Sequence, residues 1–196
     1  MRNAVVADAK SFIRSLVQFP QPGQSYESGL SLKSAAVMKY WGVDSGGLPQ
    51  VTDCNGAAKI IMARGLMDVI TPQTFDALYT SGSVPMKGRS VPISQMKPGD
   101  WGYLQNDWDY LTVQPGGPAM GENIIKLVGN DSYFDFPNGA LTLAGWTQSL
   151  IAAYNIGLAD ADKITTIPGW LPQYNQFLDV ATIAMNVFDL RNKKPG

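Results

Sequence analysis

The sequence predicts an α+β fold in which helices come first and a small antiparallel sheet follows. Apolar side chains recur at helical spacing over about the first eighty residues. After about residue 100 the pattern changes to short β-rich segments, which are separated by turns rich in Gly, Pro, Asn and Asp. A length of 196 residues, of which 45% are apolar and 16% charged, suffices for one hydrophobic core and argues against disorder.

Four helices are predicted ahead of the strands, each from apolar residues that recur every three to four positions. Pro20 ends the first helix, because proline lacks the N–H that would continue it. Thr52 or Asp53 provides an N-cap for the helix that follows Cys54, and Thr71 caps the next one. The predicted helical ranges are 5–19, 31–41, 57–70 and 71–82.

Four strands are predicted in the middle of the chain, each bounded by turn-forming residues. They are expected at residues 101–104, 110–113, 123–128 and 132–136. Gly129-Asn130-Asp131 indicates a tight turn between the last two of these strands. A helix is predicted over residues 142–154, and an apolar stripe from Phe177 to Phe188 predicts a C-terminal helix.

The composition excludes several classes of protein. The formal net charge is −1 and no basic run is present, so we expect no binding to nucleic acid. A single cysteine cannot form an internal disulfide. The absence of histidine rules out a Ser-His-Asp triad, a Cys-His pair and a His-ligated zinc site within this chain. Any catalysis must therefore use carboxylates, lysine, tyrosine, cysteine or backbone groups.

The N-terminal segment lacks the pattern of a secretory signal, because Asp8, Lys10 and Arg14 interrupt its apolar run. No apolar stretch approaches the roughly 18 residues that are needed to cross a bilayer. We therefore expect a soluble protein with no N-terminal signal and no membrane span.

The single cysteine, Cys54, stands at the start of a predicted helix. Cysteine is often a small buried hydrophobic residue, and that structural role is one interpretation of Cys54. At a helix N-terminus, however, the unsatisfied N–H groups stabilise a thiolate, lower the thiol pKa and can hold an oxyanion. Because a reactive cysteine belongs at such a position, Cys54 is a candidate nucleophile.

Motifs on both sides of this helix resemble the papain-like cell-wall peptidase superfamily. Asp53-Cys54-Asn55-Gly56 is similar to the motif that opens the nucleophile helix there, and Lys97-Pro98-Gly99-Asp100 is similar to the motif before the first central strand. The next strand in that superfamily begins with the catalytic histidine, whereas here Glu122 stands at that position. Gly121-Glu122-Asn123-Ile124-Ile125 looks instead like the small bacterial transglutaminases of spore coats, in which a glutamate partners the cysteine.

This resemblance implies one papain-like domain over residues 1–196, in which the nucleophile helix packs on a small antiparallel sheet. The resemblance covers about residues 31–150, which would form the core of the domain. Residues 1–30 and 151–196 would add helical extensions at the two ends.

The resemblance also implies that Cys54 and Glu122 form the catalytic pair, with Asp53 as a second acidic residue beside them. Burial would raise the pKa of the glutamate and the helix end would lower that of the thiol, so that a proton can pass between them. Cys54 would attack the side-chain amide of a protein glutamine, release ammonia and form a thioester. A lysine amine of another protein would then form an isopeptide bond, whereas attack by water would make the enzyme a glutamine deamidase.

Six further residues are predicted to contact the substrate. Trp108 or Tyr110, in a polar segment, would line the tunnel for the glutamine side chain. Asp135 replaces a histidine of the spore-coat enzymes and would hydrogen-bond near the site. The complete set is Trp108, Tyr110, Asn123, Tyr133, Phe134 and Asp135. We expect no metal and no organic cofactor, because calcium-loop spacing is absent and a thioester mechanism needs neither.

Other interpretations of the same residues are a cell-wall peptidase, a catalytically inactive papain-like binding module and a structural protein with a buried cysteine. The peptidase conflicts with the absence of histidine, on which that chemistry relies. The inactive module fits the loss of two histidine positions. A transglutaminase would take as partners proteins with accessible glutamine and lysine. It would be cytoplasmic or spore-associated in bacteria, or delivered as an effector.

Overall fold

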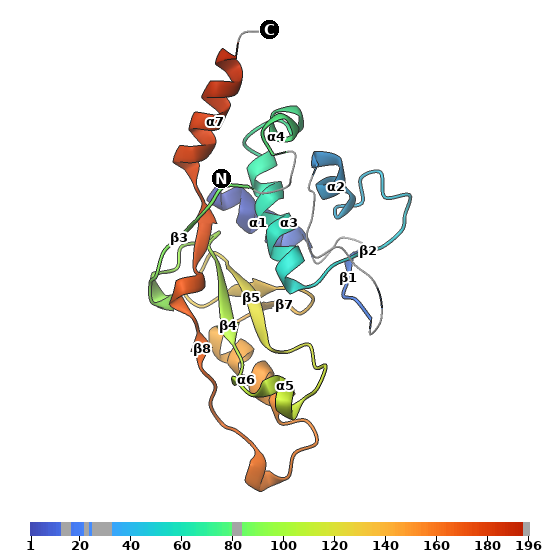
Figure 1. Cartoon of the computed structure of the whole chain (residues 1–196), viewed down its shortest axis with the longest axis vertical. Coiled ribbons are helices and arrows are strands. Elements are labelled where there is room, and N and C mark those ends of the chain that lie inside the picture. Colours follow the sequence, from blue (N-terminus) through green and yellow to red (C-terminus); the bar gives the residue numbers. More distant parts are fainter. Residues whose placement is uncertain (13–16, 22–23, 25–32, 80–83, 194–196) are drawn as a thin grey trace.

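An antiparallel sheet forms the centre of the computed structural model, which describes residues 1–12, 17–21, 24, 33–79 and 84–193 (Figure 1). Its strands are β3 (Met86–Gly88), β4 (Trp101–Gln105), β5 (Gly121–Lys126), β6 (Tyr133–Asp135), β7 (Gly139–Leu141), β8 (Gly169–Trp170) and β9 (Gln176–Leu178). Within the described residues the strand order is β3-β9-β4-β5-β6-β7, and β8 also pairs with β4. The longest ladder joins β4 to β5, so these two strands are the centre of the sheet.

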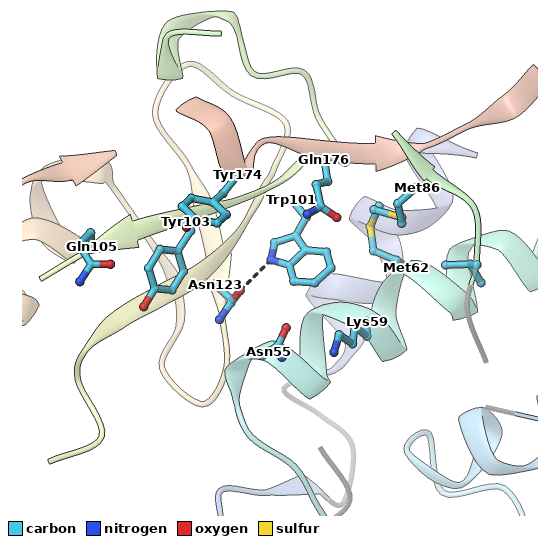
Figure 2. A pocket seen from close by; sticks show the side chains of 11 residues that line it. Asn55, Lys59, Met62, Met86, Trp101, Tyr103, Gln105, Asn123, Tyr174 and Gln176 are labelled. Carbon is cyan, nitrogen blue, oxygen red and sulfur yellow. Dashed lines mark hydrogen bonds between the residues drawn. The ribbon is translucent and has the colours of Figure 1, made fainter. Parts of the chain in front are cut away.

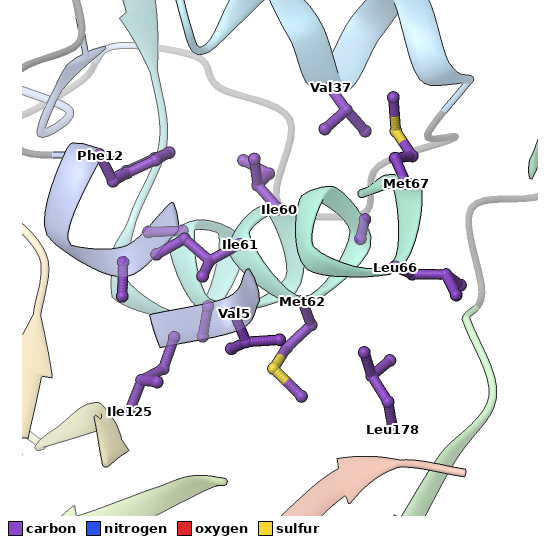
Figure 3. Packing of buried hydrophobic residues seen from close by; sticks show 14 of the residues in the cluster. Val5, Phe12, Val37, Ile60, Ile61, Met62, Leu66, Met67, Ile125 and Leu178 are labelled. Atoms are coloured by element: carbon purple, nitrogen blue, oxygen red, sulfur yellow. The ribbon is translucent and has the colours of Figure 1, made fainter. Parts of the chain in front are cut away.

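One face of the sheet is covered by helices from the N-terminal part of the chain. They are α1 (Arg2–Phe12), α2 (Ser34–Lys39), α3 (Cys54–Met67) and α4 (Pro72–Leu78). Figure 3 shows α3 passing between α1 and α2, with Ile60, Ile61 and Leu66 buried around it. Because α3 is apolar on nearly every side, it forms the core of this layer instead of a surface helix.

The opposite face is covered by α6 (Leu143–Tyr154), whose Trp146 is fully buried against Leu104 and Ile124. Neighbouring residues of a strand point to opposite faces. Accordingly, Ile124 packs with α6, whereas Ile125 packs with α3. The two hydrophobic clusters therefore hold the central strands from both sides and fix the position of the α3 N-terminus relative to β5.

A buried ionic cluster fastens the N-terminus to the sheet. The carboxylate of Asp100, which is fully buried, pairs with the guanidinium groups of Arg2 and Arg89. It also accepts a hydrogen bond from the backbone N–H of Lys97 at 3.0 Å. Asp100 therefore acts as a structural turn residue just before β4.

The predicted strand at residues 110–113 is wrong, because this segment is the short helix α5 (Tyr110–Val113). Its place is set by contacts to the end of α6 rather than by a strand partner. The side chain of Gln114 donates hydrogen bonds to the carbonyls of Tyr154 and Ile156, and the hydroxyl of Tyr154 donates to Asp109. Strand β4 meanwhile pairs with β5, β8 and β9.

The first predicted helix is shorter than expected, since α1 ends at Phe12 and Val17–Gln18 form β1 instead. Strand β1 pairs in parallel with β2 (Gln50–Val51), a contact between segments far apart in sequence that the local pattern could not indicate. Residues 13–16 of the predicted helix lie outside the described residues. So do residues 31–32 of the second predicted helix and 80–82 of the fourth.

The C-terminal extension contributes strands as well as helix α7 (Val180–Asn192). Phe177 and Leu178, which the sequence placed in the last helix, belong to β9 because both β3 and β4 offer it pairing partners. Asp179 then caps α7 by accepting from the N–H of Thr182. Short 3₁₀ helices lie at Ile93–Gln95, Asp160–Asp162 and Pro172–Tyr174. None of the helices in the described residues combines the length and apolar character required to span a bilayer.

Candidate active site

Cys54 is the first residue of α3, and its position is fixed by the residues on either side. The carboxylate of Asp53 accepts a hydrogen bond from the N–H of Gly56 at 2.6 Å and so caps the helix. A Cβ atom at Gly56 would lie 2.1 Å from the hydroxyl oxygen of Thr52, so the close turn needs glycine there. Asp53 and Gly56 of the Asp-Cys-Asn-Gly motif thus set the start of the helix at the thiol.

Asn123 on β5 holds the sulfur from the sheet side. Its Nδ2 donates a hydrogen bond to Cys54 Sγ at 3.2 Å. Its Oδ1 accepts one from Trp101 Nε1 on β4 at 3.0 Å, which is the dashed line in Figure 2. Because the indole can only donate, it fixes which end of the amide faces the sulfur.

Two carboxyl groups complete the cluster around the thiol. Cys54, Glu122 and Asp135 each place one ligand atom so that all three atoms lie within 4.8 Å of one another. Glu122 is near the start of β5, and Asp135 is the last residue of β6. Since these strands are antiparallel, the start of one lies beside the end of the other. The topology therefore brings both acids to the sheet end that faces α3.

The pKa of the Cys54 thiol is raised, whereas the helix N-terminus led us to expect a lowered pKa. Burial and the charge of Asp135 raise the pKa of Cys54 to about 12, although the hydrogen bond from Asn123 acts to lower it. The prediction of a lowered thiol pKa is therefore wrong. Two neighbouring carboxyl groups and partial burial outweigh the helix end, so the resting residue is a neutral thiol at neutral pH.

Both carboxyl groups have raised pKa values, as the sequence led us to expect for Glu122. Burial raises the pKa of Glu122. Burial, together with the proximity of Glu122, raises the pKa of Asp135 well above its usual range. Burial, Cys54 and Glu122 also raise the pKa of Tyr103 to about 12. A proton can therefore be kept within this cluster near neutral pH.

Cys54, Glu122 and Asp135 are also the candidate metal ligands among the described residues. A thiolate and two carboxylates could bind one divalent cation of borderline softness. The same closeness that permits a metal also raises the pKa values of all three groups. A cation would therefore have to displace protons from the cluster.

A cavity of about 670 Å³ opens at the start of α3, where Asn55 lines it, although Cys54 itself is not among the lining residues (Figure 2). Asn123, the hydrogen-bond partner of the sulfur, is part of its wall. Trp101, Tyr103 and Gln105 line it from alternate positions of β4, as expected for one face of a strand. The remaining lining residues are Asn55, Lys59, Met62, Val84, Met86, Tyr174 and Gln176. The cavity is thus aromatic and amide-rich, with a lysine as its charged group.

The predicted substrate-binding residues divide into two groups. Asn123 and Asp135 lie at the thiol, as described above. Trp108 is 73% exposed and does not line the cavity. Tyr110, Tyr133 and Phe134 are buried packing residues, so their assignment to a substrate tunnel is not supported by their positions.

Three groups of cavity residues were missed at the sequence level. Trp101 and Tyr103 are absent from the predicted substrate-binding set, although their period-two spacing on a predicted strand places them on the same face as each other. Tyr174 and Gln176 carry no such signal, because they reach the cavity only after the C-terminal segment joins β4. Lys59 lies one turn from Asn55 on α3, which is the one clue that the two share a helix face.

A solved bacterial structure resembles this chain over nearly its whole length. The transglutaminase from Geobacillus stearothermophilus, in a form without its C-terminal extension, matches with a TM-score of 0.66 at 19% sequence identity. The match covers 94% of this chain and 92% of that chain. No protein-family model and no curated protein sequence matches. The chain therefore has a transglutaminase-like α+β fold, and the predicted fold class, a helix packed on a small antiparallel sheet, is confirmed.

Proposed function

We propose that this protein transfers the acyl group of a protein glutamine side chain to a lysine amine, with Cys54 as the nucleophile. The observation that carries the proposal is the approach of the thiol to Glu122 and Asp135 within 4.8 Å at the start of α3. Nucleophilic catalysis by cysteine requires a group close enough to accept the thiol proton. Since histidine is absent from the sequence, a carboxylate is the base that this site offers.

The reaction begins with the neutral thiol and the Glu122 carboxylate. As Cys54 Sγ attacks the carbon of the glutamine carboxamide, its proton moves to Glu122, and a tetrahedral oxyanion forms. Glu122 then gives that proton to the departing nitrogen, the C–N bond breaks, and ammonia leaves behind a thioester. The lysine amine attacks the thioester, transfers a proton to Glu122, and expels the thiolate, which takes the proton back. Atoms and charges return to their starting positions.

The environment of Cys54 suits proton transfer during attack rather than a preformed thiolate. Burial raises the pKa values of both Cys54 and Glu122. The thiol of Cys54 therefore stays neutral until the attack, and the pair carries one negative charge, on the Glu122 carboxylate. Asn123 donates to the sulfur and stabilises negative charge as it appears there. The backbone N–H groups of the first turn of α3 are the candidate donors for the oxyanion.

The cavity beside the thiol supports a peptide substrate. Its volume of about 670 Å³ exceeds the need of one carboxamide side chain and leaves room for neighbouring peptide groups. Trp101, Tyr103 and Tyr174 provide flat apolar walls, while Asn55 and Gln176 provide amide hydrogen-bond partners. The Geobacillus protein of similar fold is named a transglutaminase, which agrees with this chemistry. We further propose the spore-coat branch as the nearest type, on the Gly121–Ile125 motif.

The test is to incubate the protein with casein and a primary-amine probe and to follow amine incorporation and ammonia release. Incorporation that Cys54→Ala abolishes and Glu122→Gln reduces by at least about 100-fold supports the proposal. Asp53→Asn is the matched acidic control and should cost much less, because Asp53 caps the helix. Ammonia release without incorporation would indicate a deamidase. If neither amine incorporation nor ammonia release is detected, and Cys54 does not react with iodoacetamide, the result would indicate an inactive binding module.

A further inference from the structure

The C-terminal segment at residues 169–178 runs along the edge of β4 and supplies one wall of the cavity. Strand β8 pairs with β4 at one end of the segment, and β9 pairs with β4 at the other. Between these pairs the chain leaves the ladder in the 3₁₀ helix Pro172–Tyr174. Figure 2 shows Tyr174 and Gln176, the two wall residues, reaching the cavity from this segment. The wall therefore comes from a short, irregular piece of chain.

Tyr174 needs support from outside its own turn. A 3₁₀ helix of three residues has poor hydrogen-bond geometry and gives little rigidity by itself. The side chain of Tyr174 is 50% exposed and packs edge-to-face on Tyr103, with the ring centroids 5.9 Å apart. A side chain that becomes ordered only on binding reduces the affinity that its contact provides. A wall that binds a ligand well therefore needs an attachment that fixes this part of the backbone.

Asn175, which lies between the two wall residues, provides that attachment. It is fully buried, and its Oδ1 accepts a hydrogen bond from Arg89 Nε at 3.0 Å. Its Nδ2 donates to the Asp100 carboxylate at 3.5 Å. The backbone carbonyl of Asn175 accepts from the N–H of Arg89 at 2.9 Å, and its own N–H donates to the carbonyl of Pro172. Because a buried amide is costly without such partners, this network fixes the position of Asn175.

Arg89 is itself held in place, which makes it a rigid partner for Asn175. Its guanidinium pairs with the fully buried carboxylate of Asp100. It also lies 5.5 Å from the centre of the Phe177 ring. Neighbouring side chains of an extended chain point to opposite sides. Asn175 and Phe177 accordingly contact this cluster, whereas the two wall residues face the cavity.

We propose that residues 169–178 form one wall of the site for the glutamine-containing peptide, and that Asn175 is the positioning residue that holds Tyr174 and Gln176 on this wall. The inference rests on the proposed function, because that function names the peptide as the ligand. Asn175 is buried and does not line the cavity, so it acts through its two neighbours. Tyr174 covers an apolar part of the peptide, and the amide of Gln176 hydrogen-bonds a peptide group.

The test measures peptide binding in Cys54→Ala, a background in which no acyl transfer occurs. The Kd of a fluorescently labelled glutamine peptide is followed by fluorescence anisotropy. In this background Asn175→Ala should weaken binding by about five- to tenfold. In a chain that also carries Tyr174→Ala and Gln176→Ala, the same substitution should change the Kd by less than about twofold, because the residues through which it acts are already absent.

Asn155→Ala is the matched control for loss of a hydrogen-bonded asparagine. Asn155 also uses both ends of its amide, on the backbone of Ile164, and it does not line the cavity. This substitution should leave the Kd of the peptide unchanged. Arg89→Lys tests the same attachment if Asn175→Ala does not fold, because lysine keeps a cation beside Asp100 but lacks the Nε donor. Arg89→Lys should weaken peptide binding by about threefold.

A kinetic measurement in the otherwise wild-type chain separates positioning from general stability. Asn175→Ala should raise KM for the peptide by about fivefold, with a smaller effect on kcat, because the wall contributes to binding and lies apart from the thiol. A loss confined to kcat would contradict the inference.

The binding experiment has two further outcomes that would overturn the inference. One is an equal loss of affinity from Asn175→Ala with and without the wall residues, which would make Asn175 a residue of general stability. The other is no binding of the peptide to the Cys54→Ala protein. If amine incorporation is active in either case, the proposed function stands and only the inference fails. Coupled binding in a protein without transferase activity would mean that only the proposed function fails.

Discussion

Asn123 Nδ2 lies 3.2 Å from Cys54 Sγ, and this hydrogen bond joins the centre of the sheet to the first turn of α3. The amide cannot turn round without losing the hydrogen bond from Trp101 to its oxygen. A donor of fixed orientation at a sulfur favours the thiolate over the thiol. Asn123 is therefore the group that partly offsets the carboxyls around Cys54.

Removing this donor should slow the chemistry of the thiol. Asn123→Ala is expected to reduce the rate of Cys54 alkylation by iodoacetamide at pH 8 by about 10- to 100-fold, because a hydrogen bond to a charged group contributes about 1.5–3 kcal/mol. Trp101→Phe should give a smaller decrease in the same direction. Trp108→Phe, at an indole that is 73% exposed, is the control. An equal effect of the two tryptophan substitutions would be inconsistent with the orienting role of Trp101.

Lys59 should bias the choice of substrate. It lines the cavity, and no ion pair or hydrogen bond of its side chain is found within the described ranges. Peptides with an acidic residue near the glutamine should therefore be preferred over peptides with a basic one, by about fivefold for a partly exposed charge. Lys59→Glu should reverse the preference, measured as a ratio of kcat/KM, whereas Lys39→Glu on the exposed side of α2 should leave it unchanged. An unaltered ratio in Lys59→Glu would remove this lysine from substrate selection.

Asp8 should make stability depend on pH. Burial and Asp68 raise its pKa from 3.8 to about 7, although Arg64 lies 3.9 Å away and acts in the opposite direction. An acid whose folded-state pKa is raised costs stability as pH rises above its unfolded value, and the cost grows until the folded value is reached. Asp8→Asn should therefore raise Tm at pH 8, raise it less at pH 5, and give no gain below about pH 4. A gain that is equal at all three pH values would contradict this account.

Asp100 should be needed for stability rather than for catalysis. Asp100→Asn leaves Arg2 and Arg89 without their buried carboxylate, and loss of one partner of a buried pair typically costs about 3 kcal/mol. The measurement is the free energy of unfolding in urea. Asp160→Asn, which breaks the exposed pair with Lys163, is the control and should cost less than about 1 kcal/mol. A similar cost for the two substitutions would mean that the buried cluster adds little.

Much of the fold follows from local sequence. The start of α3 is set by the Asp53 cap and by the small residue at Gly56, both of which act within one helical turn. The helix predicted at residues 142–154 and the strands predicted at 101–104 and 123–128 correspond to α6, β4 and β5, with ends that differ by one or two residues. Cys54 and Glu122 were proposed from the motifs around them, and the structure places them together, while their catalytic roles stay predictions.

Tertiary structure alone decided the remainder. Residues 110–113 became a helix, and residues 176–178 a strand, because short segments take the conformation that their distant partners allow. Asp135 reached the thiol only through the antiparallel pairing of β6 with β5. The raised pKa of Cys54 depends on burial and on that carboxylate. Burial and electrostatic contacts depend on residues that are far apart in the chain, so a local sequence pattern cannot predict these contacts.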